Sequence, residues 1–528
     1  MSVARNASFG IATLAAGVLL AGPQAAGVAT ADSSGSQPAH SAATARGAGA
    51  ATGSSGRNIK PANSTALAER TPATAGRPPA ALVNAAAAVT AKVVPVHAAA
   101  PTALATTTHL AALTTPVMTV AKGLLPPSVA SWLSNIAAKL RSLIEGAAVW
   151  VRRTFFDAAP TVDAVQLTGQ TSGAITGNLN IEDAVGNKTT TTILQSAQNG
   201  TVVINPDGTY TYTPGTTFTG QDSFIIKVTE SGTHIDLANP LRPAAVYVNV
   251  VVDQGTQIYP TFKFKYSTGS IFWTSEAEAA LQWSATQVAS AIVVTTPTTL
   301  TLTVRGRLGV DEDGKKYDAL ASASSPRVNK SSSGFYGTVV QQKILTGTDA
   351  NGNAPDGTVT FNFVKSWGYG NTISDTQFDF ESVAMHELTH ALGWTDALDE
   401  PGDNNGTNWT TYDKFITNSS GTAAINSTTY KYNPALESNI IGKNGGLYFN
   451  GPNAVAAYGG KPVPLYTPET YDGGSSIAHT DDNTFNGTIQ PRDLMNAVDP
   501  FGPGPRTFSA VDRGVLEDLG YTLAPVDS

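Results

Sequence analysis

The pattern of apolar and polar positions changes its character along the chain. Residues 32–116 consist mainly of Ala, Ser, Thr, Gly and Pro, a composition that buries too little apolar surface to offset chain entropy. Between 128 and 156 the apolar residues recur at helical spacing after Pro126 and Pro127, which predicts a helix. We therefore expect a disordered stalk and then an amphipathic helical linker at 117–159. This helix packs on a neighbouring domain, or serves as a propeptide helix or a membrane-surface helix.

Residues 160–253 show a period of two instead. Runs such as 201–204 and 209–212 alternate in the manner of strands, and Asn-Pro-Asp-Gly at 205–208 joins them as a turn. The pattern places one face of each strand inward. It predicts an all-β sandwich over 160–253.

Residues 255–528 mix both periods. The segments 275–293 and 379–392 are helical in pattern, whereas 299–308 and 358–363 alternate like strands. This part of the chain is predicted to form one α+β domain, and it contains the candidate catalytic and metal-binding residues.

Composition then limits the chemistry. The chain has 528 residues, so several domains are expected. It has 32 basic and 40 acidic residues and a net charge of −8, which offers no broad basic field, and nucleic acid is therefore not an expected partner. There is no cysteine, so a transition metal would be held by His, Asp and Glu, and the chain has seven histidines.

The N-terminus has the layout of a secretory signal peptide. Arg5 precedes an apolar stretch at 10–22, and Ala29-Thr30-Ala31 precedes Asp32, so we predict a signal peptide at 1–31 cleaved near Ala31. A transmembrane anchor is the alternative, but the stretch is shorter than the ~20 residues of a span. An exported chain without cysteine suggests a bacterial protein, secreted or held at the cell surface.

The helix predicted near residue 386 carries the strongest chemical signal. Asp379 can cap it and Gly393 suits its C-terminus. His386 and His390 lie four residues apart, so both imidazoles face the same way, and Glu387 can reach a water on a metal held between them. Two surface histidines one turn apart are the alternative interpretation.

A catalytic zinc usually has three protein ligands and an open position, so a third ligand is required. Asp396 lies six residues after His390, and a carboxylate can bind zinc. His479 lies far downstream, and only three histidines follow the sandwich segment. Because so few histidines are available in this part of the chain, His479 is favoured over Asp396.

These residues resemble the metzincin clan of zinc peptidases. The resemblance rests on a helix motif and on a later segment that looks like the methionine turn beneath the metal: His386-Glu387-x-x-His390-x-x-Gly393 and Leu494-Met495-Asn496. The arrangement is most similar to leishmanolysin-like peptidases, in which a long insertion precedes the third histidine, as His479 precedes Met495 here. The likeness spans roughly 379–521. The family's cysteines are absent, and Asp396 keeps the short-spacing alternative open.

The resemblance implies an exported zinc endopeptidase acting on a protein or peptide. Zinc would activate a water and polarise the scissile carbonyl, and Glu387 would accept the proton as general base and then return it to the leaving amine. Met495 would support the site from beneath, or is an ordinary core methionine. Candidates for stabilising the oxyanion, by residue type alone, are Tyr466, Tyr471 and Tyr521.

Other functions remain open beside this one. Residues 200–224 resemble the cadherin-like, immunoglobulin-fold repeats of bacterial surface proteins, so the sandwich could contact a surface while the C-terminal domain is inactive. A thermolysin-like site would use Glu437 as third ligand. The loop at 349–357 offers oxygens for Ca²⁺, although a solvated turn is the simpler interpretation. Because every candidate ligand lies beyond Asp253, we expect the sandwich to be dispensable for chemistry.

Overall fold

The structure is a computed structural model of the chain. It describes residues 158–526, except 185, 217, 219, 233–244, 312–313 and 329–330, together with 29–31 and a few residues between 131 and 150. The stalk predicted at 32–116, most of the signal peptide and most of the linker helix lie outside the described residues.

The predicted sandwich is present. Its first sheet has the order β3-β4-β8-β7 and its second the order β10-β9-β6, with a short β2-β5 pair beside them. The strands are β2 (Thr161–Val162), β3 (Val165–Gln166), β4 (Ile175–Asn178), β5 (Ile181–Glu182), β6 (Thr189–Gln195), β7 (Gly200–Ile204), β8 (Thr209–Pro214), β9 (Gln221–Glu230) and β10 (Ala245–Asp253). The turn predicted at 205–208 joins β7 to β8, where the N–H of Gly208 donates to the Asn205 carbonyl over 3.0 Å. All strand pairs of this module are antiparallel.

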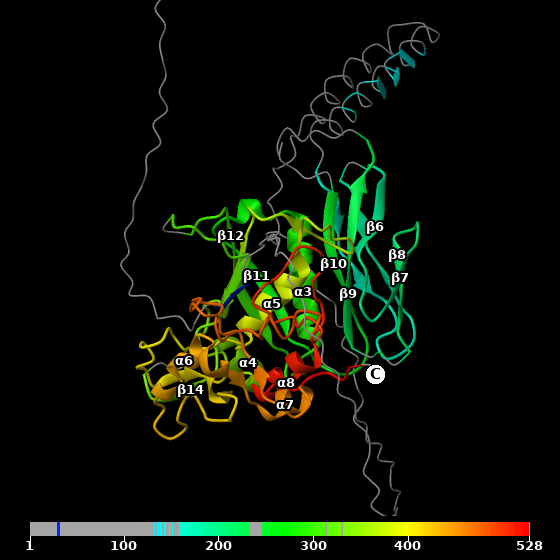
Figure 1. The fold of residues 1–528 in the computed structure, drawn as a ribbon. Helices are drawn as coiled ribbons and strands as arrows, with labels where there is room; N and C mark the ends of the chain where they lie inside the picture. The colour runs from blue at the N-terminus through cyan, green and yellow to red at the C-terminus, as the bar shows by residue number, and fades with distance from the viewer. Residues whose placement is uncertain are drawn as a thin grey trace, which may run out of the picture. The chain divides into compact units, whose positions relative to one another are not determined.

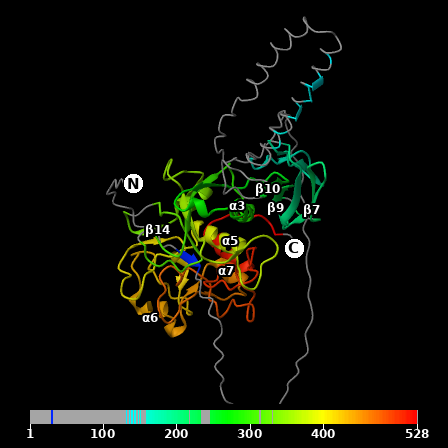
Figure 2. The ribbon, with the colours of Figure 1, turned by 90° about the horizontal axis from the view of Figure 1, so that it is seen from above.

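Strand β9 is buried on both of its faces. Phe224, Ile226 and Val228 point into the core of the sandwich. Ile225 belongs instead to the large core of the C-terminal region, where helix α3 (Ser275–Ser290) packs against β9 and β10. Figures 1 and 2 both show α3 beside these two strands. A strand with alternating faces thus serves two cores at once.

The C-terminal region is organised around a five-stranded mixed sheet. Its order is β1-β13-β15-β12-β11, in which β11, β12 and β15 are parallel, and β13 and β1 are antiparallel to their neighbours. The strands are β1 (Ala29–Ala31), β11 (Thr261–Tyr266), β12 (Thr299–Arg307), β13 (Ala321–Ser324) and β15 (Gly357–Asn362). Strand β12 buries every second residue, as its pattern predicted. Helices α3 and α5 (Phe380–Ala391) pack on each other, and α5 also contacts β13.

The rest of this region consists of short elements. The strands are β14 (Gly334–Tyr336), β16 (Trp367–Gly368), β17 (Phe378–Asp379), β18 (Asn408–Thr410), β19 (Ile416–Thr417), β20 (Tyr448–Phe449) and β21 (Val463–Pro464), and the helices are α4 (Val339–Thr346), α6 (Glu437–Ile440), α7 (Pro452–Ala457) and α8 (Ala510–Asp518), with 3₁₀ turns at Ser270–Phe272, Asp413–Phe415, Pro434–Leu436 and Lys443–Gly445. Ser509 and Asp512 form a capping box on α8, which satisfies two amides of its first turn.

The edge of the sheet beside α5 is occupied by the chain itself. Strand β1 pairs with β13 from Ala29 to Ala31, at the end of the predicted signal peptide. Cleavage near Ala31 would remove β1 and leave the edge of β13 unpaired. Among the described helices, none is both long and apolar enough to cross a bilayer.

Candidate metal centre

Helix α5 begins and ends where the sequence predicted. The Asp379 side chain accepts a hydrogen bond from the Ser382 amide over 3.0 Å, which caps the helix. The helix closes at Leu392, and Gly393 follows with a φ of 100°, a conformation that favours glycine. Every residue of α5 is buried, so its polar side chains need partners inside the protein.

The structure brings His386, His390 and His479 together. The Nε2 atoms of His386 and His390 lie 2.9 Å apart, and each lies 3.1 Å from Nε2 of His479. All three side chains are fully buried. They are all the histidines that the described residues contain, so the third imidazole favoured by the sequence meets the helical pair.

Each imidazole is oriented by a backbone carbonyl on its far side. The Nδ1 atoms of His386, His390 and His479 lie 2.7 Å from the carbonyl oxygens of Leu494, Trp394 and Ser475, respectively. A carbonyl oxygen only accepts, so Nδ1 must carry the proton in all three rings. In the neutral rings Nε2 is then an unprotonated acceptor, and three lone pairs point toward one another.

Burial keeps these rings neutral. It lowers the pKa of His479 to about 3, with a smaller contribution from His386. The pKa of His390 is also held well below its usual value, first by burial and then by the two neighbouring imidazoles. Neutral imidazole is the form in which histidine binds metals.

The turn after α5 depends on Gly393. Its positive φ reverses the chain, and the next residue, Trp394, turns its carbonyl back to His390. A Cβ at position 393 would lie 3.1 Å from Oε1 of Gln341, so even a methyl group would crowd this turn.

The chain before His479 is held in an unfavourable conformation. Ile477 has a φ of 72°, a region that a β-branched residue adopts at a cost of about 1–3 kcal/mol. Its N–H donates to the Tyr466 carbonyl over 2.7 Å, and its carbonyl accepts from the Tyr412 hydroxyl over 3.2 Å. Nothing in the sequence pattern had marked Ile477, yet its backbone fixes the approach of His479 to the helix.

The segment around Met495 lies against both parts of the site. Its neighbour Leu494 anchors His386, and the Met495 carbonyl accepts from the Thr480 amide over 2.9 Å. The Thr480 hydroxyl also donates to the Asn496 side chain. Met495 itself is fully buried. The segment therefore ties the His479 loop to the helix histidines.

Glu387 is fully buried on the same helix. Burial, and to a lesser extent the negative charge of Glu387, raises the pKa of Tyr317. The Tyr317 hydroxyl also hydrogen-bonds Ser322 of β13 over 2.9 Å. A protonated phenol thus lies within the electrostatic reach of Glu387, and no pattern in the sequence marks Tyr317.

The two other candidate ligands lie elsewhere. Among the described residues, the three histidines form the one group of at least three His, Asp or Glu side chains close enough to share a metal, and neither Asp396 nor Glu437 belongs to it. Burial and the neighbouring Asp413 raise the pKa of Asp396 well above its usual value. Glu437 accepts a hydrogen bond from the Gly402 amide over 2.7 Å.

The remaining candidates have other partners. In the 349–357 loop, Asp349 and Asp356 form ion pairs with Lys343, with N–O distances of 2.7 and 3.1 Å. The hydroxyls of Tyr471 and Tyr521 donate to the carbonyls of Leu398 and Leu392. Lys343 thus pairs with both carboxylates of this loop, and the two phenols are hydrogen-bonded to backbone carbonyls. Tyr466 contributes its backbone, accepting from Ile477 and donating to His479.

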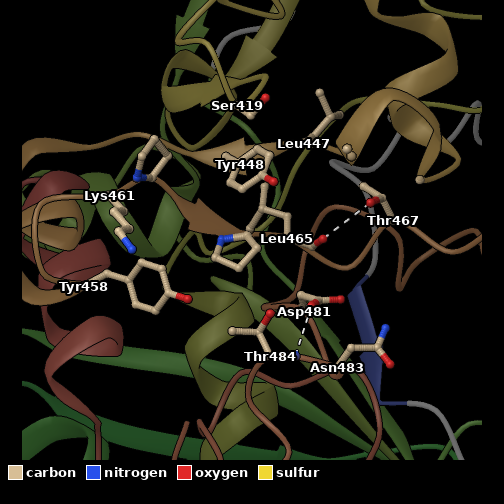
Figure 3. A pocket seen from close by; sticks show the side chains of 15 residues that line it. Ser419, Leu447, Tyr448, Tyr458, Lys461, Leu465, Thr467, Asp481, Asn483 and Thr484 are labelled. Carbon is tan, nitrogen blue, oxygen red and sulfur yellow. Dashed lines mark hydrogen bonds between the residues drawn. The ribbon is translucent and has the colours of Figure 1, made fainter. Parts of the chain in front are cut away.

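A cavity of about 690 Å³ opens beside the segment that follows His479. Figure 3 shows Tyr458 and Lys461 on the left of it and Asp481 and Thr484 toward the lower centre. The Asp481 amide donates to the Pro464 carbonyl over 3.0 Å, which joins this wall to β21. The lining is mostly polar and includes one cation and one carboxylate.

Comparison with known proteins identifies the first module. The sequence profile of a bacterial Ig domain matches residues 157–237, which confirms the immunoglobulin-like sandwich. No curated protein was found to match the chain. The match ends before α3 and covers none of the histidines at the centre, so the chemistry of the C-terminal region must be argued from its residues.

We expect His479→Ala to lose zinc far more severely than Asp396→Ala. Removing one of three imidazoles should nearly abolish binding at low micromolar zinc, whereas Asp396→Ala should raise the zinc dissociation constant by less than about 10-fold. Dissociation constants from competition with a chromophoric chelator, with circular dichroism to confirm folding, provide the comparison. A metal-free Asp396→Ala protein beside a zinc-loaded His479→Ala protein would contradict the assignment.

Gly393→Ala should weaken zinc binding, with Gly402→Ala as its matched control. The two glycines have φ values of 100° and 101°, so both substitutions should cost about 1–2 kcal/mol of stability. A Cβ at position 402 meets nothing, and Gly402 does not precede a carbonyl that orients a histidine. Thermal unfolding should therefore respond to both variants and zinc affinity to Gly393→Ala alone. Equal zinc affinities would show that the turn does not position His390.

Proposed function

We propose that the chain is an exported zinc-dependent endopeptidase of the metzincin type, closest to the leishmanolysin-like arrangement. The observation that carries this proposal is the convergence of three unprotonated Nε2 atoms, 2.9 to 3.1 Å apart, in a fully buried site. Three lone pairs brought together without a proton between them are electrostatically unfavourable unless a cation binds there.

The donor set fits zinc. Zinc binds neutral imidazole at about 2.0–2.1 Å with tetrahedral angles, which implies nitrogens roughly 3.3 Å apart. The nitrogens of His386, His390 and His479 are only a few tenths of an ångström closer than this. Three histidines leave a fourth position for water or substrate, as catalytic zinc sites do. A bound zinc would supply an activated water and polarise the scissile carbonyl.

The protein's own residues would carry the proton. Glu387 adjoins His386 on α5, so its carboxylate can take up a proton from the attacking water and deliver it to the leaving amine. Full burial of Glu387 strengthens its electrostatic interactions with whatever binds at the centre. The protonated phenol of Tyr317, which responds to the charge of Glu387, is a candidate donor to the developing oxyanion.

Two features support a peptide substrate. Strand β13 contacts α5, and its outer edge pairs with β1 at the end of the predicted signal peptide. Removal of that peptide would free this edge to bind an extended peptide by backbone hydrogen bonds. The polar cavity beside Asp481 lies next to the segment carrying His479 and could receive a substrate side chain.

A surface-binding protein with an inactive C-terminal domain is the second candidate. The bacterial Ig domain match at 157–237 favours it, because sandwiches of this architecture occur in many cell-surface domains and are compatible with contact to a surface. This alternative predicts a chain that adheres to a surface but cleaves nothing.

Glu387→Gln should keep zinc and lose activity. Without the general base, kcat for an unstructured protein substrate should fall by at least about 10²-fold, and a chelator should likewise abolish wild-type activity until zinc is restored. Glu437→Gln serves as the control, because Glu437 lies outside the cluster, and its rate should equal that of the wild type. If Glu387→Gln cleaves at the wild-type rate, or the chelated protein remains fully active, the proposed mechanism is wrong.

A further inference from the structure

One arginine, Arg506, connects the Ig module to the start of α5, and its side chain is 14% exposed. Nε of Arg506 donates to both carboxylate oxygens of Asp379, at 3.0 and 2.9 Å. One terminal nitrogen donates to the Gly370 carbonyl at 2.9 Å and to Glu381 at 3.3 Å. The other donates to Oε1 of Gln195 at 2.7 Å. Four partners from three separate segments thus share one guanidinium.

The helix side of this cluster fixes the N-terminus of α5. Asp379 caps the helix, and its other oxygen accepts the Gly504 amide over 2.9 Å. Glu381, in the first turn, is fully buried and accepts the Gly370 amide over 2.7 Å. Burial raises the pKa of Glu381 to about 7, with Arg506 acting in the opposite direction. Two neighbouring carboxylates so deeply placed require a cation, and Arg506 supplies it.

On the Ig module, the position of Gln195 is fixed by a strand irregularity and by close packing. The pairing of β6 with β9 slips between Ile193 and Gln195, and such a bulge redirects a side chain. Gln195, just past the slip, is 6% exposed. Beside it, the chain at Gly370 approaches so closely that a Cβ would lie 2.7 Å from the Leu194 carbonyl.

Further polar contacts follow the same boundary. The indole of Trp283 in α3 donates to the Ser223 carbonyl of β9 over 3.0 Å, and Asn249 of β10 donates to Thr286 over 3.2 Å. With Ile225 in the C-terminal core, the contact is continuous from β6 to β10. These contacts argue against the expectation that the sandwich is dispensable.

We propose that the Ig module is a structural part of the metal centre, in which Gln195 and Arg506 act as positioning residues for α5. The proposal rests on the proposed zinc-peptidase function in one respect, because that function makes α5 the helix that carries two metal ligands and the general base. Gln195 aims the guanidinium, Arg506 holds the cap and first turn, and α5 carries His386, Glu387 and His390 into register with His479.

A matched pair of substitutions tests this. Gln195→Met removes the acceptor of the guanidinium and keeps the side-chain length. Gln198→Met is the control, because Gln198 lies on the same module at an exposed position and its side chain donates to the Arg506 carbonyl, over 2.8 Å, and not to the guanidinium. Arg506→Lys is the stronger change, since one ammonium cannot replace the planar fork. All variants are made in the full chain.

Two readouts separate positioning from general stability. In metal-free protein, amide hydrogen exchange in the first turn of α5 should accelerate about 10-fold for Gln195→Met relative to Gln198→Met, because the first turn would open more often. The zinc dissociation constant should rise by about 10-fold, the lower end for a residue behind the ligands, and kcat should fall with KM unchanged. Arg506→Lys should exceed Gln195→Met in each measurement.

Equal exchange and equal zinc affinity in Gln195→Met and Gln198→Met would overturn the proposal. A lower unfolding temperature with unchanged exchange, affinity and kcat would also overturn it, since Gln195 would then only stabilise the fold. If the wild-type chain binds zinc but cleaves nothing, the peptidase proposal fails while exchange and zinc affinity still decide the role of Gln195. If it binds no zinc at all, exchange alone decides whether Gln195 holds the first turn of α5.

Discussion

Three imidazole nitrogens whose lone pairs converge in a buried space repel one another unless a cation lies between them. In this chain, hydrogen bonds on the opposite side of each ring fix the convergence, because each Nδ1–H donates to a backbone carbonyl oxygen 2.7 Å away. The rings can neither rotate nor accept a proton on Nε2 without losing a buried hydrogen bond or burying a charge. The geometry of the histidine centre therefore depends on the segments that carry those three carbonyls.

A different structural feature fixes the position of each of these three carbonyls. Gly393 turns the chain so that Trp394 faces His390. The strained backbone of Ile477 shapes the loop that carries His479 and Ser475. Leu494 reaches His386 from the segment of Met495, which also holds the His479 loop through Thr480. The helix itself is held at its first turn by Arg506, which extends the support of the centre into the Ig module.

The sequence revealed those parts of the site that local patterns encode. The spacing of His386 and His390, the cap at Asp379 and the stop at Gly393 are all signals within one helix, and the structure has that helix at Phe380–Ala391. His479 was favoured over Asp396 because histidines are scarce. The carbonyl acceptors, the strain at Ile477 and the contact of Gln195 with Arg506, 311 residues apart, carry no periodicity, since they arise only when distant segments pack. The Ig module was visible in its strand pattern, but the second buried face of β9 was not.

The central claim is that three histidines of this chain bind one zinc and leave a position open for chemistry. Zinc K-edge X-ray absorption on the purified full chain measures this directly. The account predicts one zinc per chain with three imidazole nitrogens at about 2.0–2.1 Å and one light oxygen ligand, and loss of one imidazole shell in His479→Ala. A spectrum with fewer than three imidazoles would contradict it. So would a chain that is incubated with zinc and retains none after unbound metal is removed by dialysis.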